Sequence, residues 1–151
     1  SSVRRPLLIA DLNETYIDRL LQQENISNRL KRHLFYPGYI HNADLATLYN
    51  AAFAFLYPSL RESFGIPQLE AMACGTPVVT SAASAIPEVA GQGAILVDPT
   101  DPTAIADALL RLETDAAFRA RQVAYGLERV KRFSWEKTAR HLLTLYESLG
   151  K

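Results

Sequence analysis

The sequence predicts an α/β fold, with a doubly wound and mostly parallel sheet followed by a group of C-terminal helices. Over about the first 100 residues, short apolar runs alternate with longer segments of helical periodicity, which is the pattern of right-handed βαβ units. Glycine, proline, asparagine and aspartate separate these segments, as expected of turns and helix caps. Beyond residue 101 the apolar runs stop and only helical patterns follow.

The composition is that of an ordinary globular domain. The 151 residues are 48% hydrophobic and 21% charged, and their number suits one domain with a substantial core. Sixteen basic and sixteen acidic residues cancel, which argues against a general binder of nucleic acid or anionic membranes. The single cysteine, Cys74, fits a reducing compartment, and no apolar run reaches the roughly eighteen residues of a membrane span. We therefore expect a soluble, cytoplasmic protein.

Three strands, each followed by a helix, are expected in the first half of the chain. The apolar runs that predict these strands lie at 6–10, 33–39 and 53–57. The first run is expected to be buried. Asn13 and Asn42 are expected to cap the first two helices, and Gly75 to end the third. The expected apolar faces are Ile17, Leu20 and Leu21 in the first helix and Leu45, Leu48, Tyr49 and Ala52 in the second.

Two further strands and three helices are expected in the second half. The apolar runs that predict the strands lie at 77–81 and 94–98. Asp101 and Pro102 mark the start of one helix, a second should span 115–131, and Ser134 should cap the third. The residues expected to pack are Ala120, Val123, Leu127 and Val130 in the second helix and Trp135, Ala139, Leu142, Leu143, Tyr146 and Leu149 in the third.

Ligands of parallel α/β sheets bind outside the carboxyl ends of the strands. The positions that follow expected strands are Asp11, 39–41, 59–66 and 81–85.

The loop before the third helix has the residues of an anion site. Pro58 stops the preceding strand, so 59–66 should be a loop. Gly65 allows close backbone approach, and Pro67 suits the first position of a helix. The N–H groups of 68–70 would then point outward at the positive end of the helix dipole, where phosphate binds well.

Two glutamates flank this helix start. Glu62 lies in the loop and Glu70 in the first turn, eight positions apart. Carboxylates accept hydrogen bonds from the hydroxyls of a diol, so glutamates on both sides of a phosphate site suit a sugar nucleotide. A plainer interpretation is that Glu70 only complements the helix dipole and that Glu62 is a solvated charge beside Arg61. Spacing and helix physics leave both interpretations open.

Several blocks resemble one family. "PSLRESFGIPQLEAMACGTPVV" resembles the signature of retaining glycosyltransferases of the GT-B fold, in the family called glycosyltransferase family 4 or group 1. Glu62 and Glu70 meet its E-x7-E motif, and the run E-A-M-A-C-G-x-P-V-V follows. "FYPGYIHNADLATLYNAA", "AIPEVAGQGAILVDPTDPTAIADALLRL" and "RFSWEKTARHLLTLYESL" resemble its other segments, in the same order. The resemblance covers nearly all of 33–149.

The resemblance implies a Rossmann-like C-terminal domain that binds the nucleotide-sugar donor. Glu62 would be the catalytic residue, contacting the transferred sugar and stabilising its developing positive charge, and Glu70 would bind the ribose. The remaining donor-binding residues would be Ser63, Phe64, Gly65 and Ile66 at the sugar, Gln68 and Leu69 at the diphosphate, and Tyr39 and Ile40 near the base. Such enzymes need no bound metal or other cofactor.

The chain also departs from the family pattern. No glycine-arginine pair and downstream lysine, which clamp the donor phosphates in the family, follow the first strand; Arg4 and Arg5 precede it. We therefore expect residues 1–151 to be a partial donor domain without its first βαβ unit, inactive alone. An acceptor-binding N-terminal domain or a partner chain should complete it. A sheet lacking that unit should expose an edge or apolar face, which favours self-association.

Two alternatives accompany this interpretation. The same fold could serve as a noncatalytic module that binds sugar nucleotides or proteins, although such a module need not keep both Glu62 and Glu70. An unrelated phosphorylated receiver domain would use Asp11 or Asp98 as its acidic site, but the acidic cluster and the partner threonine and lysine that it needs are not evident.

Overall fold

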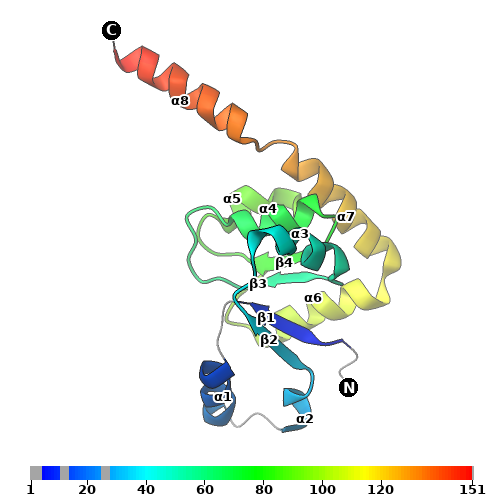
Figure 1. Cartoon of the computed structure of the whole chain (residues 1–151). Helices are drawn as coiled ribbons and strands as arrows, with labels where there is room; N and C mark the ends of the chain where they lie inside the picture. Colours follow the sequence, from blue (N-terminus) through cyan, green and yellow to red (C-terminus); the bar gives the residue numbers. More distant parts are fainter. Residues whose placement is uncertain (1–4, 11–13, 25–27, 151) are drawn as a thin grey trace. The chain divides into compact units, whose positions relative to one another are not determined.

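A computed structural model describes residues 5–10, 14–24 and 28–150 (Figure 1). The predicted cap Asn13 and the candidate Asp11 lie outside the described residues. The chain divides into two compact units, an N-terminal unit, Ser1–Leu45, and a C-terminal unit, Ala46–Lys151.

The N-terminal unit holds a two-stranded parallel sheet. Its elements are β1 (Leu7–Ala10), α1 (Glu14–Gln23), α2 (Asn28–Lys31), β2 (Leu34–Gly38) and the start of α3 (Asn42–Ala51). The prediction that the first strand is buried is wrong, because Leu7 and Leu8 are each 44% exposed. A sheet of two strands has too few neighbouring elements to cover both of its faces. In α1 Ile17 and Leu21 are buried as predicted, whereas Leu20 is exposed.

The C-terminal unit holds a three-stranded parallel sheet in the order β3-β4-β5. Its elements after α3 are β3 (Phe55–Tyr57), α4 (Ile66–Ala73), β4 (Val78–Ser81), α5 (Ile86–Ala90), the 3-10 helix η1 (Gly91–Gly93), β5 (Ile95–Val97), α6 (Pro102–Thr114), α7 (Ala116–Val130) and α8 (Trp135–Leu149). All five predicted strands form with parallel pairing, but they are divided between two sheets.

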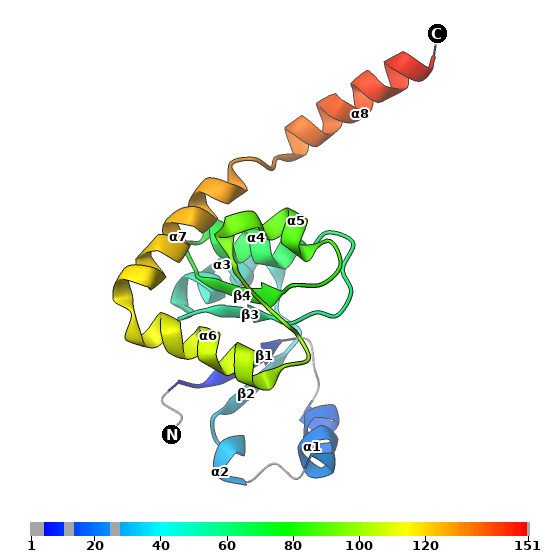
Figure 2. The same cartoon turned by 180° about the vertical axis from the view of Figure 1, so that it is seen from behind.

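Helices cover both faces of the sheet in the C-terminal unit. Every residue of the central strand β4 is buried. Helix α6 lies against one face, and α4 and α5 lie against the other (Figures 1 and 2). The core between the sheet and α6 consists of Val79, Val97, Ala108, Leu112 and Phe118.

Local end signals were predicted well. Asp101 caps α6, since its carboxylate accepts hydrogen bonds from the N–H groups of Thr103 (2.8 Å) and Ala104 (3.2 Å). Gly75, at φ 72°, ends α4 in a Schellman motif, in which the N–H of Thr76 donates to the carbonyl of Ala71 (3.0 Å).

The predicted face of α7 is right only in part, because Val123 and Val130 are half-buried whereas Ala120 is exposed. Its buried residues are Phe118 and Gly126, whereas Leu127 is 41% exposed. Helix α7 packs on α4 and η1, and an added Cβ at Gly126 would lie 3.2 Å from Cγ of Met72. Close approach to Met72 thus requires a glycine, which an apolar periodicity cannot show.

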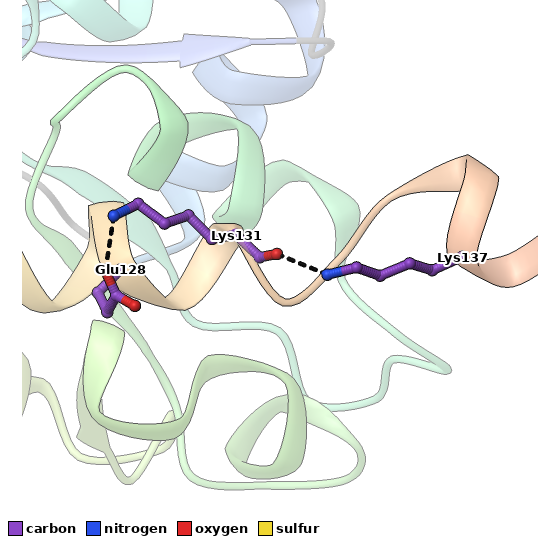
Figure 3. A network of polar contacts seen from close by, with 3 residues as sticks. All are labelled: Glu128, Lys131 and Lys137. Carbon is purple, nitrogen blue, oxygen red and sulfur yellow. Dashed lines mark hydrogen bonds and ion pairs between the residues drawn. The ribbon is translucent and has the colours of Figure 1, made fainter.

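Helix α8 begins as predicted, but its predicted packing face is not buried in the described part of the chain. Ser134 caps it by accepting from the N–H of Lys137 (3.1 Å), yet none of its residues is buried. Figure 3 shows the polar contacts at its start, where Nζ of Lys137 donates to the carbonyl of Lys131 (2.9 Å) and Nζ of Lys131 contacts Glu128 (2.7 Å). A cation at the C-terminal carbonyls of α7 complements the helix dipole.

Candidate functional site

The loop between β3 and α4 carries the predicted site. Gly65 precedes α4 in the left-handed conformation (φ 86°, ψ 57°), and no side chain caps the helix. Pro67 is the second residue of α4, one position after the helix start that the sequence predicts, and it lies in the first turn. The first N–H groups of α4 therefore lack a side-chain acceptor, which leaves them suited to an anion.

Glu62 is held from both its side chain and its backbone. The hydroxyls of Tyr57 (2.5 Å) and Ser59 (2.9 Å) both donate to its Oε1. The Ser84 hydroxyl donates to the Glu62 carbonyl (2.7 Å) and accepts from the Glu62 N–H (3.3 Å). Ser84 has a positive φ of 59°, an uncommon conformation for a residue other than glycine that marks a constrained loop.

Glu70 lies on the exposed surface of α4 and is held by a single phenol. The Tyr49 hydroxyl donates to its Oε2 (3.2 Å), and Tyr49 itself is buried. The backbone of Tyr49 is fixed by the Thr76 hydroxyl, which donates to its carbonyl (2.5 Å).

A row of aromatic rings connects the supports of the two glutamates. The ring of Phe55 stacks on Tyr57 (5.7 Å, 20°) and meets Tyr49 edge-on (5.2 Å, 85°). Burial, followed by hydrogen bonding to Glu62, raises the pKa of Tyr57 to about 12. Burial and the charge of Glu70 likewise raise the pKa of Tyr49. Both phenols therefore stay protonated at neutral pH and act as donors to the carboxylates.

The other predicted residues of this segment divide between surface and interior. Ser63, Phe64 and Ile66 are exposed on the loop and the helix start, and Leu69 is half-buried. Gln68 is fully buried, and its Nε2 donates to the Phe64 carbonyl (3.4 Å). Its Oε1 has no hydrogen-bond partner among the described residues. Gln68 therefore holds the backbone of the loop from the protein interior.

Tyr39 and Ile40 belong to the N-terminal unit. Tyr39 is 70% exposed, and its ring meets His41 edge-on (5.2 Å). Their place in a donor site stays a prediction.

The loop also contacts the connector between α7 and α8. The ring of Phe64 meets Phe133 edge-on (5.7 Å, 88°). The guanidinium of Arg129 lies over Phe133 (5.1 Å) and donates from Nε to the carbonyl of Val89 (2.8 Å) and from Nη2 to that of Glu88. Phe64 is thus connected to α5 through Phe133 in the connector and Arg129 in the last turn of α7.

Sequence reasoning missed three residues of this site. The sequence patterns place Tyr49 on a packing face and Tyr57 in a strand, and they put Ser84 near the site without giving it a role. In the structure all three hold the glutamates. A tyrosine directly before Pro58, at a strand's carboxyl end, was an available signal for Tyr57. The contact of Tyr49 with Glu70 joins residues far apart in the sequence, so no local pattern predicts it.

Neither a cluster of metal-binding side chains nor a membrane-spanning helix is found in the described part of the chain. There, no group of three or more His, Cys, Asp or Glu side chains could hold a metal ion. None of the described helices is long and apolar enough to span a bilayer. Asp98 makes a local turn by accepting from the hydroxyl (2.7 Å) and the N–H (2.8 Å) of Thr100.

Fold and geometry together define a parallel α/β domain with a candidate ligand site at the carboxyl ends of its strands. The family of glycosyl transferases group 1 matches residues 6–129, and the chain belongs to that family. This membership sets aside the receiver-domain alternative.

Among curated relatives, O-antigen chain mannosyltransferase B of Escherichia coli is 43% identical over 114 residues, which cover 76% of this chain and 30% of the relative. D-inositol 3-phosphate glycosyltransferase of Salinispora tropica is 46% identical over 109 residues, covering 68% and 22%. The chain thus spans less than a third of the length of these relatives.

Solved structures confirm the predicted fold class. Sucrose-phosphate synthase from Thermosynechococcus elongatus matches with a TM-score of 0.80 and 33% identity, over 95% of this chain and 38% of that protein. HepE from Anabaena, in complex with UDP, matches with a TM-score of 0.84 and 22% identity, over 97% and 42%, a likeness of fold alone. The chain has the Rossmann-like architecture of a C-terminal GT-B domain.

Proposed function

We propose that this chain is the donor-binding domain of a retaining glycosyltransferase of family 4. The parent protein transfers a hexose-type sugar from a nucleotide-diphosphate sugar to an acceptor. The observation that carries the proposal is the pair Glu62 and Glu70, each held by a tyrosine phenol on either side of an uncapped helix start. Transferase names among the relatives also support it and do not favour the noncatalytic alternative.

The acceptor capacity of Glu70 suits a ribose. A carboxylate has about four lone-pair sites, two on each oxygen. Tyr49 occupies one site on Oε2, so both oxygens of Glu70 can still accept. Two neighbouring hydroxyls, one on each oxygen, match the cis-diol of a ribose.

The diphosphate belongs at the start of α4. The N–H groups near Gln68 and Leu69 lie at the positive end of the helix and have no side-chain cap. The backbone of 63–66 then meets the sugar. In this arrangement no metal or other cofactor is needed, and charge on the departing diphosphate is stabilised by helix N–H groups and by basic groups of the parent protein.

The chemical role of Glu62 follows from its charge. Transfer breaks the bond between the anomeric carbon and the phosphate oxygen, and the electron pair leaves with the nucleoside diphosphate. Positive charge develops on the sugar, and the fixed carboxylate of Glu62 stabilises it in the transition state. The acceptor hydroxyl oxygen then bonds to the anomeric carbon on the same face of the sugar, which retains the configuration, and gives its proton to the departing diphosphate.

Calorimetric titration of the chain with UDP-, GDP- and ADP-sugars tests the donor site. We include UDP-glucose because HepE, which shares the fold, was solved with that ligand. Weak binding of one nucleotide sugar is expected, and no turnover, because the acceptor side and the phosphate clamp are not in the described site. Absence of binding to every donor at millimolar concentration would exclude the proposed function, and turnover by the chain alone would exclude the partial-domain interpretation.

A further inference from the structure

We propose that Tyr57 is a positioning residue for Glu62. Its phenol occupies Oε1 of the carboxylate and leaves Oε2 as the oxygen that meets the sugar. This inference rests on the proposed function, which places the transferred sugar at Glu62.

The hydrogen bonds on Glu62 are unevenly divided between its oxygens. Tyr57 donates to Oε1 at 2.5 Å and Ser59 donates to the same atom at 2.9 Å. A carboxylate oxygen accepts about two hydrogen bonds, so Oε1 is filled. No described residue donates to Oε2, which keeps its full capacity. A sugar hydroxyl therefore finds its acceptor at Oε2 alone.

Tyr57 is itself held on several sides. It ends β3, whose backbone pairs with β4, and the Thr80 hydroxyl donates to its carbonyl (2.9 Å). Its ring stacks on Phe55 (5.7 Å, 20°), which in turn meets Tyr49. A phenol fixed by strand pairing and ring packing holds its acceptor in one orientation, which is what a preorganised carboxylate requires.

The backbone of Glu62 is fixed independently of the phenol. The Ser84 hydroxyl, in the loop that follows β4, bonds both the carbonyl and the N–H of Glu62. Loss of the Tyr57 hydroxyl should therefore leave the loop in place and weaken the hold on the Glu62 side chain alone, which Ser59 would then hold by itself. A structural role of Tyr57 would instead disturb the whole segment.

The two glutamates differ in how they are held. Glu62 accepts two bonds on one oxygen, whereas Glu70 accepts a single, longer bond from Tyr49 (3.2 Å). Glu62 is built to present one oxygen in a set direction, and Glu70 keeps capacity on both oxygens. The change Tyr57→Phe should therefore affect the sugar, and Tyr49→Phe the nucleoside.

The test compares two ligands, a nucleoside diphosphate and its nucleotide sugar, on the protein in which this chain occurs. For Tyr57→Phe, affinity for the nucleoside diphosphate should stay within about twofold, while affinity for the nucleotide sugar falls roughly tenfold or more, as for one lost hydrogen bond to a charged group. In turnover, kcat should fall by a larger factor than the KM for the donor rises. Ser59→Ala, which removes the longer bond to the same oxygen, should shift both readouts in the same direction by a smaller factor.

Two control variants give the outcomes with which Tyr57→Phe is compared. Tyr49→Phe should lower the affinity for both ligands equally, because the nucleoside is common to them. Tyr125→Phe, a matched change at an exposed position of α7, should alter neither affinity.

The outcomes separate the two proposals. If the unaltered protein binds both ligands but Tyr57→Phe and Ser59→Ala leave the nucleotide-sugar affinity unchanged, or weaken both ligands equally, the positioning role is wrong and the donor site stands. If the unaltered protein binds neither ligand, the donor site is wrong and the role of Tyr57 falls with it.

Discussion

Glu70 is the residue on which the nucleoside assignment depends. Replacing Glu70 with alanine should lower the affinity for a nucleoside diphosphate by roughly tenfold or more, because two hydroxyl contacts to a charged acceptor are lost. Calorimetric titration with UDP and GDP measures this. Glu147→Ala, which removes an exposed glutamate of α8, is the matched control. Unchanged binding in Glu70→Ala would refute the ribose assignment.

The Tyr57 phenol also predicts a dependence of stability on pH. Its pKa is raised from the ordinary 10.0 to about 12 in the folded chain, so its neutral form is favoured by folding. The resulting stability is fully present below pH 10 and is lost as the pH rises through about 12. Urea unfolding across this window should show a falling free energy of unfolding. The decline should be shallower in Tyr57→Phe, which lacks the phenol; an equal decline in both proteins would contradict the raised pKa of Tyr57.

At the scale of elements, the contact of α7 with α4 depends on Gly126. A Cβ there would lie 3.2 Å from Cγ of Met72 and 3.4 Å from the carbonyl of Gly93. Gly126→Ala should therefore destabilise the fold by about 1–3 kcal/mol through overpacking, despite the better helix propensity of alanine. Ala124→Gly, on the exposed side of α7, measures the propensity difference alone, about 1 kcal/mol. Stabilisation by Gly126→Ala in urea unfolding would show that the helices can separate without loss.

The elements also show what the sequence could and could not predict. Caps and stops such as Asp101, Ser134 and Gly75 were predicted because their chemistry is local. The packing face of α7 was predicted only in part, because the packing there depends on a close approach at Gly126 rather than on an apolar stripe. The short helices α2 and α5 have too few residues to show a period.

The candidate site divides along the same line. The loop, the helix start and both glutamates follow from spacing and helix physics together with the family resemblance. The tyrosines that hold the glutamates required the tertiary structure, because Tyr49 reaches Glu70 from another helix. Glu62 is similarly held by Ser84, which is 22 positions away.

For the whole molecule, unburied apolar surface predicts self-association. Helix α8 exposes Trp135 (80%) and a row of leucines, and the edge strand β5 exposes Leu96. Sedimentation of the isolated chain should show mass increasing with concentration. Leu143→Glu on α8 and Leu96→Lys on β5 distinguish the two surfaces, since only the change in the associating one should restore the monomer. A strictly monomeric chain at high concentration would contradict this expectation.

The contact of Phe64 with Phe133 has a consequence that extends beyond packing. Phe133 lies directly before the cap of α8, and Phe64 lies in the loop assigned to the sugar. A displacement of Phe133 would therefore separate it from Phe64 and remove one contact of this loop. If the loop binds the sugar as proposed, a partner that displaces Phe133 on binding would change the affinity for the sugar, and the sugar would change the affinity for that partner by the same factor.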